Sequence, residues 1–143
     1  MSARYLQLDA LQEPYDLGVD ELGRTKIQFN LAAQKTASVG SVFEQELAKI
    51  LTTAAPGTFS SSGGSRNIFI GTTAKIPSGP GPYLSIISTS GAPPQKIHNN
   101  PGPSYFRPTA LIVARATDQT AAIAMARAAY DALTVVVNQT VTP

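Results

Sequence analysis

Alternation between apolar and polar side chains, in two stretches near the start of the chain, restricts its fold more than any other feature. The apolar positions are Leu6, Leu8 and Ala10 in the first stretch, and Ile27, Phe29 and Leu31 in the second. A period of two residues is typical of a strand with one buried face. Asp20-Glu21-Leu22-Gly23 lies between the stretches and is typical of a turn. Residues 5–33 are therefore expected to form a long hairpin with one apolar face.

Two later segments carry helical patterns. Ser41 and Glu44 have the spacing of a capping box, and Pro56-Gly57 ends the segment that follows. The apolar positions expected to pack are Phe43, Leu47, Ile50, Leu51 and Ala54. Thr117 or Asp118 precedes a second such segment, which is rich in alanine and is expected to pack closely on a sheet through residues that include Ile123, Tyr130 and Leu133. We expect helices over about 41–54 and 118–133.

Further strands are expected near 67–71, 83–89 and 110–116, where apolar and β-branched residues gather. Residues 78–82 and 91–108 are rich in proline and glycine, and the second segment holds five prolines. Because proline cannot donate to a strand ladder, both segments are expected to be loops. A loop as long as 91–108 is usually either functional or disordered, and we favour a binding segment over plain disorder. Residues 134–142 (TVVVNQTVT) are compatible with either a helix end or a last strand.

These patterns predict an α+β fold in which a mostly antiparallel sheet packs against two helices. At 143 residues, of which 43% are hydrophobic, the chain has the size of a single domain. Within 1–143 we distinguish an N-terminal hairpin block, 1–37, from a helix-sheet-helix body, 38–143.

The residue types argue against an enzyme. The chain has no cysteine and a single histidine, His98, which excludes thiolate catalysis and Cys/His zinc sites. His98 stands beside Asn99 and Asn100, a turn-like context, and no G-x-S-x-G nucleophile turn is present. The acids in the expected hairpin connection lack the ladder of a calcium loop. We expect no catalytic residue, no metal and no cofactor.

Charge is unevenly distributed along the chain, although its net value is only +2. Seven of the nine acids precede residue 47, whereas residues 47–117 contain no acid and these six cations: Lys49, Arg66, Lys75, Lys96, Arg107 and Arg115. One interpretation is an unevenly charged solvated surface. The other is a subunit whose oppositely charged faces meet in neighbouring copies. No stretch is expected to cross a membrane or to act as a signal peptide.

Nucleic-acid binding is a weaker alternative. Tyr83, Tyr105 and Phe106 lie near the cations of the acid-free region, and stacking combined with charge is how single strands are held. The cations are spaced roughly ten or more residues apart and so form no dense stripe. A module that binds DNA directly would lose affinity steeply as salt rises.

The order of these segments resembles that of a known family. The expected helix SVFEQELAKIL is followed by the strand NIFIG, the segment PYLSIISTSGAPPQ and the run FRPTALIVARATDQTAAIAMARAAYDAL. Residues 38–133 thereby resemble the tail terminator (minor capsid, tail-completion) proteins of long-tailed bacteriophages. In that family a hairpin with a proline and a Leu-Gly-x-Asp-x-x-Gly-Arg-like turn comes last. Residues 11–24 (LQEPYDLGVDELGR) are similar to that hairpin but come first.

The chain therefore resembles a circularly permuted member of the family. If the sheet is unchanged, the hairpin block pairs within its own chain and the two termini lie close together. The competing interpretation is that residues 1–37 are an arm that adds a hairpin to a neighbouring subunit.

The resemblance implies a virion structural protein, assembled in the host cytoplasm and located at the junction of head and tail. Family members form a homo-hexameric ring on the end of the tail tube, stop its growth and present a surface to the head connector (stopper) protein, with DNA only as passing cargo. A head-completion or connector ring is the nearest alternative, and ring stoichiometry separates the two. We expect Asp16, Asp20 and Glu21 to face cations such as Arg66, Lys75 or Arg107 of the next subunit or of the tube. A second contact with tube or connector is expected in the loop that holds Lys96, His98, Asn99 and Asn100.

Overall fold

The computed structural model describes residues 3–11, 13–36, 43–55, 57–60, 66–71, 76–96 and 103–141. The elements in chain order are β1 (Ala3–Ala10), β2 (Tyr15–Val19), β3 (Thr25–Thr36), α1 (Phe43–Ala54), β4 (Ile68–Ile70), β5 (Tyr83–Lys96), β6 (Pro103–Ala116), α2 (Gln119–Thr134) and β7 (Val137–Val141). The strands form one sheet of seven, in the order β4-β5-β6-β3-β1-β7, and β2 pairs with β3. Every pairing is antiparallel except that of β4 with β5. The expected α+β class is confirmed.

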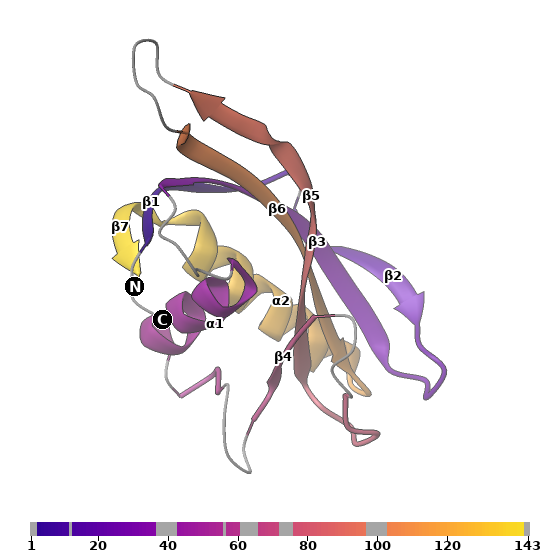
Figure 1. Cartoon of the computed structure of the whole chain (residues 1–143). Coiled ribbons are helices and arrows are strands. Elements are labelled where there is room, and N and C mark those ends of the chain that lie inside the picture. Colours follow the sequence, from indigo (N-terminus) through magenta and orange to yellow (C-terminus); the bar gives the residue numbers. More distant parts are fainter. Residues whose placement is uncertain are drawn as a thin grey trace.

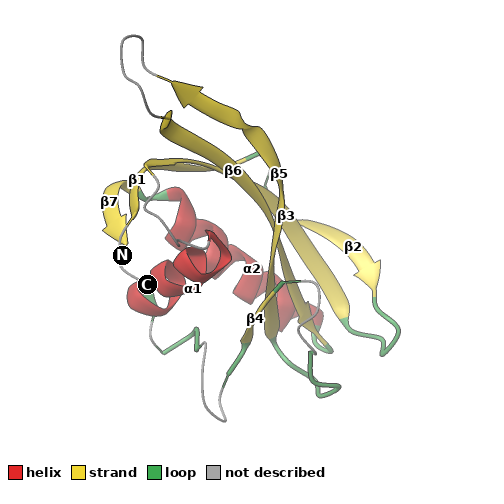
Figure 2. Ribbon diagram, viewed as in Figure 1, coloured by secondary structure: helices red, strands yellow, loops and turns green. Residues whose placement is uncertain are grey.

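Both helices cover the same face of the sheet (Figure 1, Figure 2). Alternate residues of the central strands point into this layer, among them Ile27, Phe29 and Leu31 of β3, which are at most 3% exposed. The side of α2 that faces the sheet is mostly alanine, and Ala122, Ala126 and Ala129 are at most 1% exposed. Because alanine side chains are short, α2 lies close to β3 and β6. No helix of the described residues covers the other face of the sheet, and we call it the open face.

The N-terminal hairpin contains more structure than expected. Its connection includes the strand β2, which pairs with the first part of β3 and whose residues are all exposed. β1 pairs with the last part of β3 along the same side. A bulge between Tyr5 and Gln7 shifts the register of β1, so that Tyr5 is fully buried together with Leu8. The side chain of Leu6, which we expected on the buried face, lies outside the described residues.

The expectation that 91–108 is a loop is wrong for most of its length. β5 continues to Lys96 and β6 begins at Pro103, so only residues 97–102 lie outside the described residues. The register between the two strands shifts at three places between Thr89 and Lys96. The pairing of β5 with β4 ends at Ile86, which leaves the later part of β5 at an edge of the described sheet. Prolines 93 and 94 are tolerated there because an edge strand donates fewer backbone hydrogen bonds to neighbours, and because the shifts in register leave some positions of the strand unpaired.

The helices follow their patterns with local exceptions. Asp118 caps α2 by accepting a hydrogen bond from the backbone N–H of Thr120, as expected. Ile123, expected to pack, is 46% exposed, and Ala54 is exposed as well. Ser41 lies outside the described residues, and the Glu44 carboxylate accepts a hydrogen bond from the backbone N–H of Ser88 at 3.2 Å.

The two ends of the described chain pair with one another. Residues 137–141 form a strand rather than a helix end, and β7 pairs with β1 in a register that sets Ala3 opposite Val141. β3, from the same N-terminal block, lies at the centre of the sheet between β1 and β6. The N-terminal block thus pairs within its own chain, and the termini lie side by side (Figure 1).

Candidate assembly surfaces

The turn between β2 and β3 is held together by Asp20. One oxygen of its carboxylate accepts hydrogen bonds from the backbone N–H groups of Leu22 and Arg24, at 3.0 and 2.9 Å. The other accepts from Nε of Arg24 at 2.8 Å. Gly23 follows with a φ of 76°, a conformation that glycine adopts without strain. The Asp-x-x-Gly-Arg part of the hairpin motif therefore forms a turn that is held by hydrogen bonds between its own residues.

The pKa of Asp20 reflects this arrangement. Burial acts to raise the pKa, but the hydrogen bonds from Arg24 and Leu22 and the charge of the Arg24 guanidinium outweigh it. The pKa of Asp20 is consequently lower than its ordinary value.

Arg24 fixes the hairpin to the proline-rich loop that precedes β5. Its side chain is buried, and one terminal nitrogen donates to the carbonyl oxygens of Pro77 and Gly79 at 2.6 and 3.3 Å. The guanidinium also lies 5.8 Å from the centre of the Tyr83 ring. Sequence reasoning did not single out Arg24, although its place in the Gly-Arg pair of the resembling hairpin was a usable signal.

Arg115 and Lys26 lie directly opposite one another on β6 and β3, close to this turn. Arg115 donates to the Ser85 hydroxyl at 3.1 Å. Burial and the nearby Arg24 lower the pKa of Arg115, and Asp20 partly offsets them. Arg115 and Lys26, together with Glu21 and other residues of the turn, line a hollow of about 420 Å³.

The β2–β3 hairpin, residues 15–24, exposes apolar side chains. Leu17, Val19 and Leu22 are 45%, 65% and 56% exposed. Leu11, which precedes the hairpin, is 61% exposed. Several large apolar side chains exposed on one hairpin are typical of a contact surface.

The expected interface residues divide into three groups. Asp16 and Asp20 are engaged within the chain: Asp16 accepts from the backbone N–H of Gly18 at 2.7 Å, and Asp20 forms the turn described above. Glu21, Arg66 and Arg107 are exposed. The remaining expected residues lie outside the described residues or, for Lys96, in a strand whose side chain is not described: Lys75, Lys96, His98, Asn99 and Asn100.

Arg66 is held close to β4, the strand that follows it. Its Nε donates to the carbonyl oxygen of Ile68 at 3.0 Å, and its guanidinium lies 4.9 Å from the centre of the Phe69 ring. Within the described part of one chain, no ion pair joins Arg66 or Arg107 to the hairpin acids.

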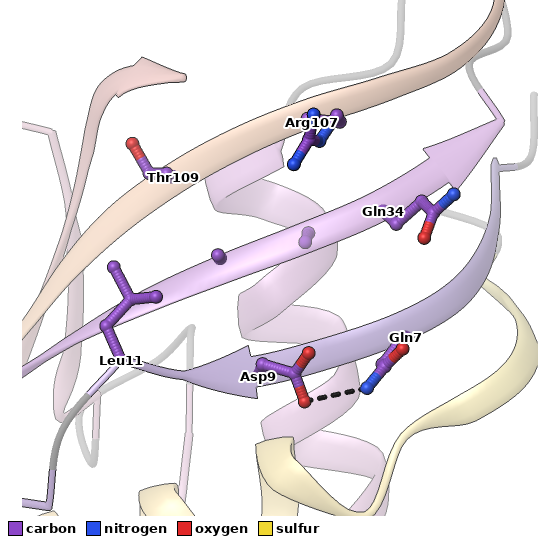
Figure 3. Close-up of a pocket in the computed structure, with 8 residues that line it drawn as sticks. Gln7, Asp9, Leu11, Gln34, Arg107 and Thr109 are labelled. Carbon is purple, nitrogen blue, oxygen red and sulfur yellow. Dashed lines mark hydrogen bonds between the residues drawn. The ribbon is translucent and has the colours of Figure 1, made fainter. Parts of the chain in front are cut away.

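A second hollow, of about 250 Å³, lies on the open face where β1, β3 and β6 run together (Figure 3). Two rows of residues that run across the three strands form this hollow. Asp9 and Thr109 flank Ala32, with which both are paired in register. Gln7 is paired with Gln34, and Arg107 stands on the far side. The short side chain of Ala32 leaves the space between them open.

A buried ionic group joins the sheet to α1 and was missed by sequence reasoning. Lys35 Nζ lies 2.5 Å from Glu46 Oε1, to which the Tyr5 hydroxyl donates at 3.0 Å. Burial and the Glu46 carboxylate raise the pKa of Tyr5 above its ordinary range, so its hydroxyl stays protonated. Two signals were available: Lys35 continues the inward alternation of Leu31 and Ala33, and Glu46 follows Phe43 at helical spacing.

Among the described residues, no group of three or more His, Asp or Glu side chains is placed to hold a metal ion. Neither helix in the described part of the chain has the length and apolar character needed to span a membrane. Comparisons of the chain with known protein families, with curated proteins and with solved structures give no match.

Proposed function

We propose that this chain is a ring-forming structural subunit of a bacteriophage virion, a tail terminator at the junction of tail and head. The observation that carries the proposal is the place of the N-terminal block: β3 lies at the centre of the sheet, and β1 pairs with the C-terminal β7. A permuted tail terminator requires this geometry, because moving a block from one end of the chain to the other preserves a fold only where the termini adjoin.

The exposed surfaces support an assembly role. The β2–β3 hairpin presents Leu17, Val19 and Leu22 to solvent, and the outer edge of β2 has no strand beside it in the described sheet. An uncovered strand edge with apolar side chains favours association with another chain. The ionic groups that are buried, Arg24-Asp20 and Lys35-Glu46, each hold two parts of the fold together. These two pairs therefore have a structural role, whereas the hairpin side chains that are exposed are available for contact with another chain.

The test is the effect of the purified protein on tail tube assembly. Adding it to polymerising tube protein should stop elongation, and it should remain at one end of each tube as visualised by electron microscopy with a labelled chain. Tubes that grow to the same lengths with and without the protein would contradict the proposal. A ring with twelve-fold rather than six-fold symmetry would favour the connector alternative.

A further inference from the structure

Two charged side chains at opposite ends of the sheet have no partner within the described part of the chain. All nine acidic residues of the sequence lie in the described ranges. Seven of them accept a hydrogen bond or form an ion pair. The other two, Glu21 at the tip of the β2–β3 hairpin and Asp131 on the exposed side of α2, do neither with any described residue, and of these only Glu21 lies on the hairpin. Arg107, at the rim of the open-face hollow, likewise has no ion pair there.

Glu21 and Arg107 cannot reach one another in a single chain. The hairpin joins β3 at Thr25, and the hollow lies beside Ala32 and Gln34 of the same strand. Nine residues of extended strand span about 30 Å, which is beyond the reach of any side chain. A contact between the two surfaces must therefore join two copies. In a ring each copy uses its hairpin on one neighbour and its hollow on the other, which makes the contact head-to-tail, whereas two copies that exchange both contacts would close as a dimer.

The two surfaces also carry apolar side chains beside their charges. Leu22, next to Glu21, is 56% exposed, and the hollow has the short Ala32 at its centre and the exposed Leu11 at one end (Figure 3). Asp9, on the β1 side of the hollow, is hydrogen bonded to Gln7 at 2.9 Å. A carboxylate entering the hollow is repelled by Asp9 and attracted by Arg107, which restricts it to the β6 side.

We propose that the Glu21-Leu22 tip of one copy docks in the open-face hollow of the next, with Glu21 against Arg107 and Leu22 over Ala32. This inference rests on the proposed function, for which it supplies the contact between subunits. It narrows the acidic side of that contact to Glu21, because Asp16 and Asp20 are engaged within their own hairpin.

The test is a charge swap measured by analytical ultracentrifugation, with the chain alone and with tail tubes. Glu21→Lys and Arg107→Glu should each weaken self-association by about tenfold or more, because an attraction becomes a repulsion. The double variant should restore association to within about threefold of the wild type. Asp131→Lys and Lys49→Glu are the matched controls: both change an exposed charge on a helix and should leave association unchanged.

A second variant tests the hollow itself. Ala32→Leu fills it without altering charge and should weaken association while the melting temperature stays close to that of the wild type. If wild-type rings form and neither the single charge variants nor Ala32→Leu affects them, the proposed contact is wrong and the proposed function stands. If the wild-type chain stays monomeric both alone and with tail tubes, both are wrong.

Discussion

The Lys35 ammonium of β3 and the Glu46 carboxylate of α1 lie 2.5 Å apart beneath the sheet, and Glu46 is fully buried. This pair links β3, which pairs with three other strands, to the shorter helix. Removing one partner leaves a charge in a site from which water is excluded, which is far more costly than removing both.

We expect Glu46→Gln or Lys35→Met to lower the free energy of unfolding by about 3–5 kcal/mol. The double variant Lys35→Met/Glu46→Leu should recover most of that loss, because two apolar side chains of similar size need no partner. Urea denaturation of the four proteins measures the effect. If the double variant lost as much free energy of unfolding as the two single variants lose together, the pair would not be coupled.

Asp20 gives the stability of the hairpin a pH dependence. Its folded pKa is lower than the ordinary value of 3.8, so its contribution to stability is present above that pH and is lost as pH falls through the lowered pKa. Asp20→Asn should therefore remove part of the acid sensitivity of thermal unfolding while lowering stability at neutral pH. Asp131→Asn, on an exposed part of α2, is the control and should leave the acid sensitivity unchanged.

Gly81 is required where the loop before β5 closely approaches the end of β6. Its φ is +83°, and a Cβ placed on it would lie 2.7 Å from the carbonyl oxygen of Arg115. Gly81→Ala should therefore lower the free energy of unfolding by about 2 kcal/mol or more. Gly57→Ala, where nothing lies within 4 Å of the added carbon, should change it by less than about 0.5 kcal/mol. Similar losses at the two positions would show that the close approach is not as described.

The alanines of α2 set its distance from the sheet. Ala126 is 1% exposed, and replacing it with leucine should cost about 1–3 kcal/mol because the helix must move outward. Ala124, on the exposed side of the same helix, should tolerate the same change with an effect of less than about 0.5 kcal/mol. Thermal denaturation of the two variants compares them directly.

Much of the fold was predictable because periodicity reports which side of an element is buried. The alternation of Ile27, Phe29 and Leu31 predicted β3, and Asp118 predicted the start of α2. The exposed position of Ile123 was not predictable from its type, because the packing of α2 depends on how closely its alanines approach the sheet. The strands around prolines 93 and 94 were missed because the argument against proline holds for regular central ladders, and β5 is irregular there.

The candidate surfaces were only partly predictable. The sequence identified the acidic hairpin and Arg107, but it could not show that Asp20 forms its own turn with Arg24, since that depends on the backbone conformation at Gly23. The hollow around Ala32 arises from pairing between residues far apart in the chain. Such pairing has no signal in a single sequence.

The most direct measurement of the central claim is the location and number of copies of this chain in purified virions, by averaging electron micrographs of the neck. The account predicts a single ring of six subunits between the tail tube and the head. Virions whose neck contains no annular copy of the chain would contradict it.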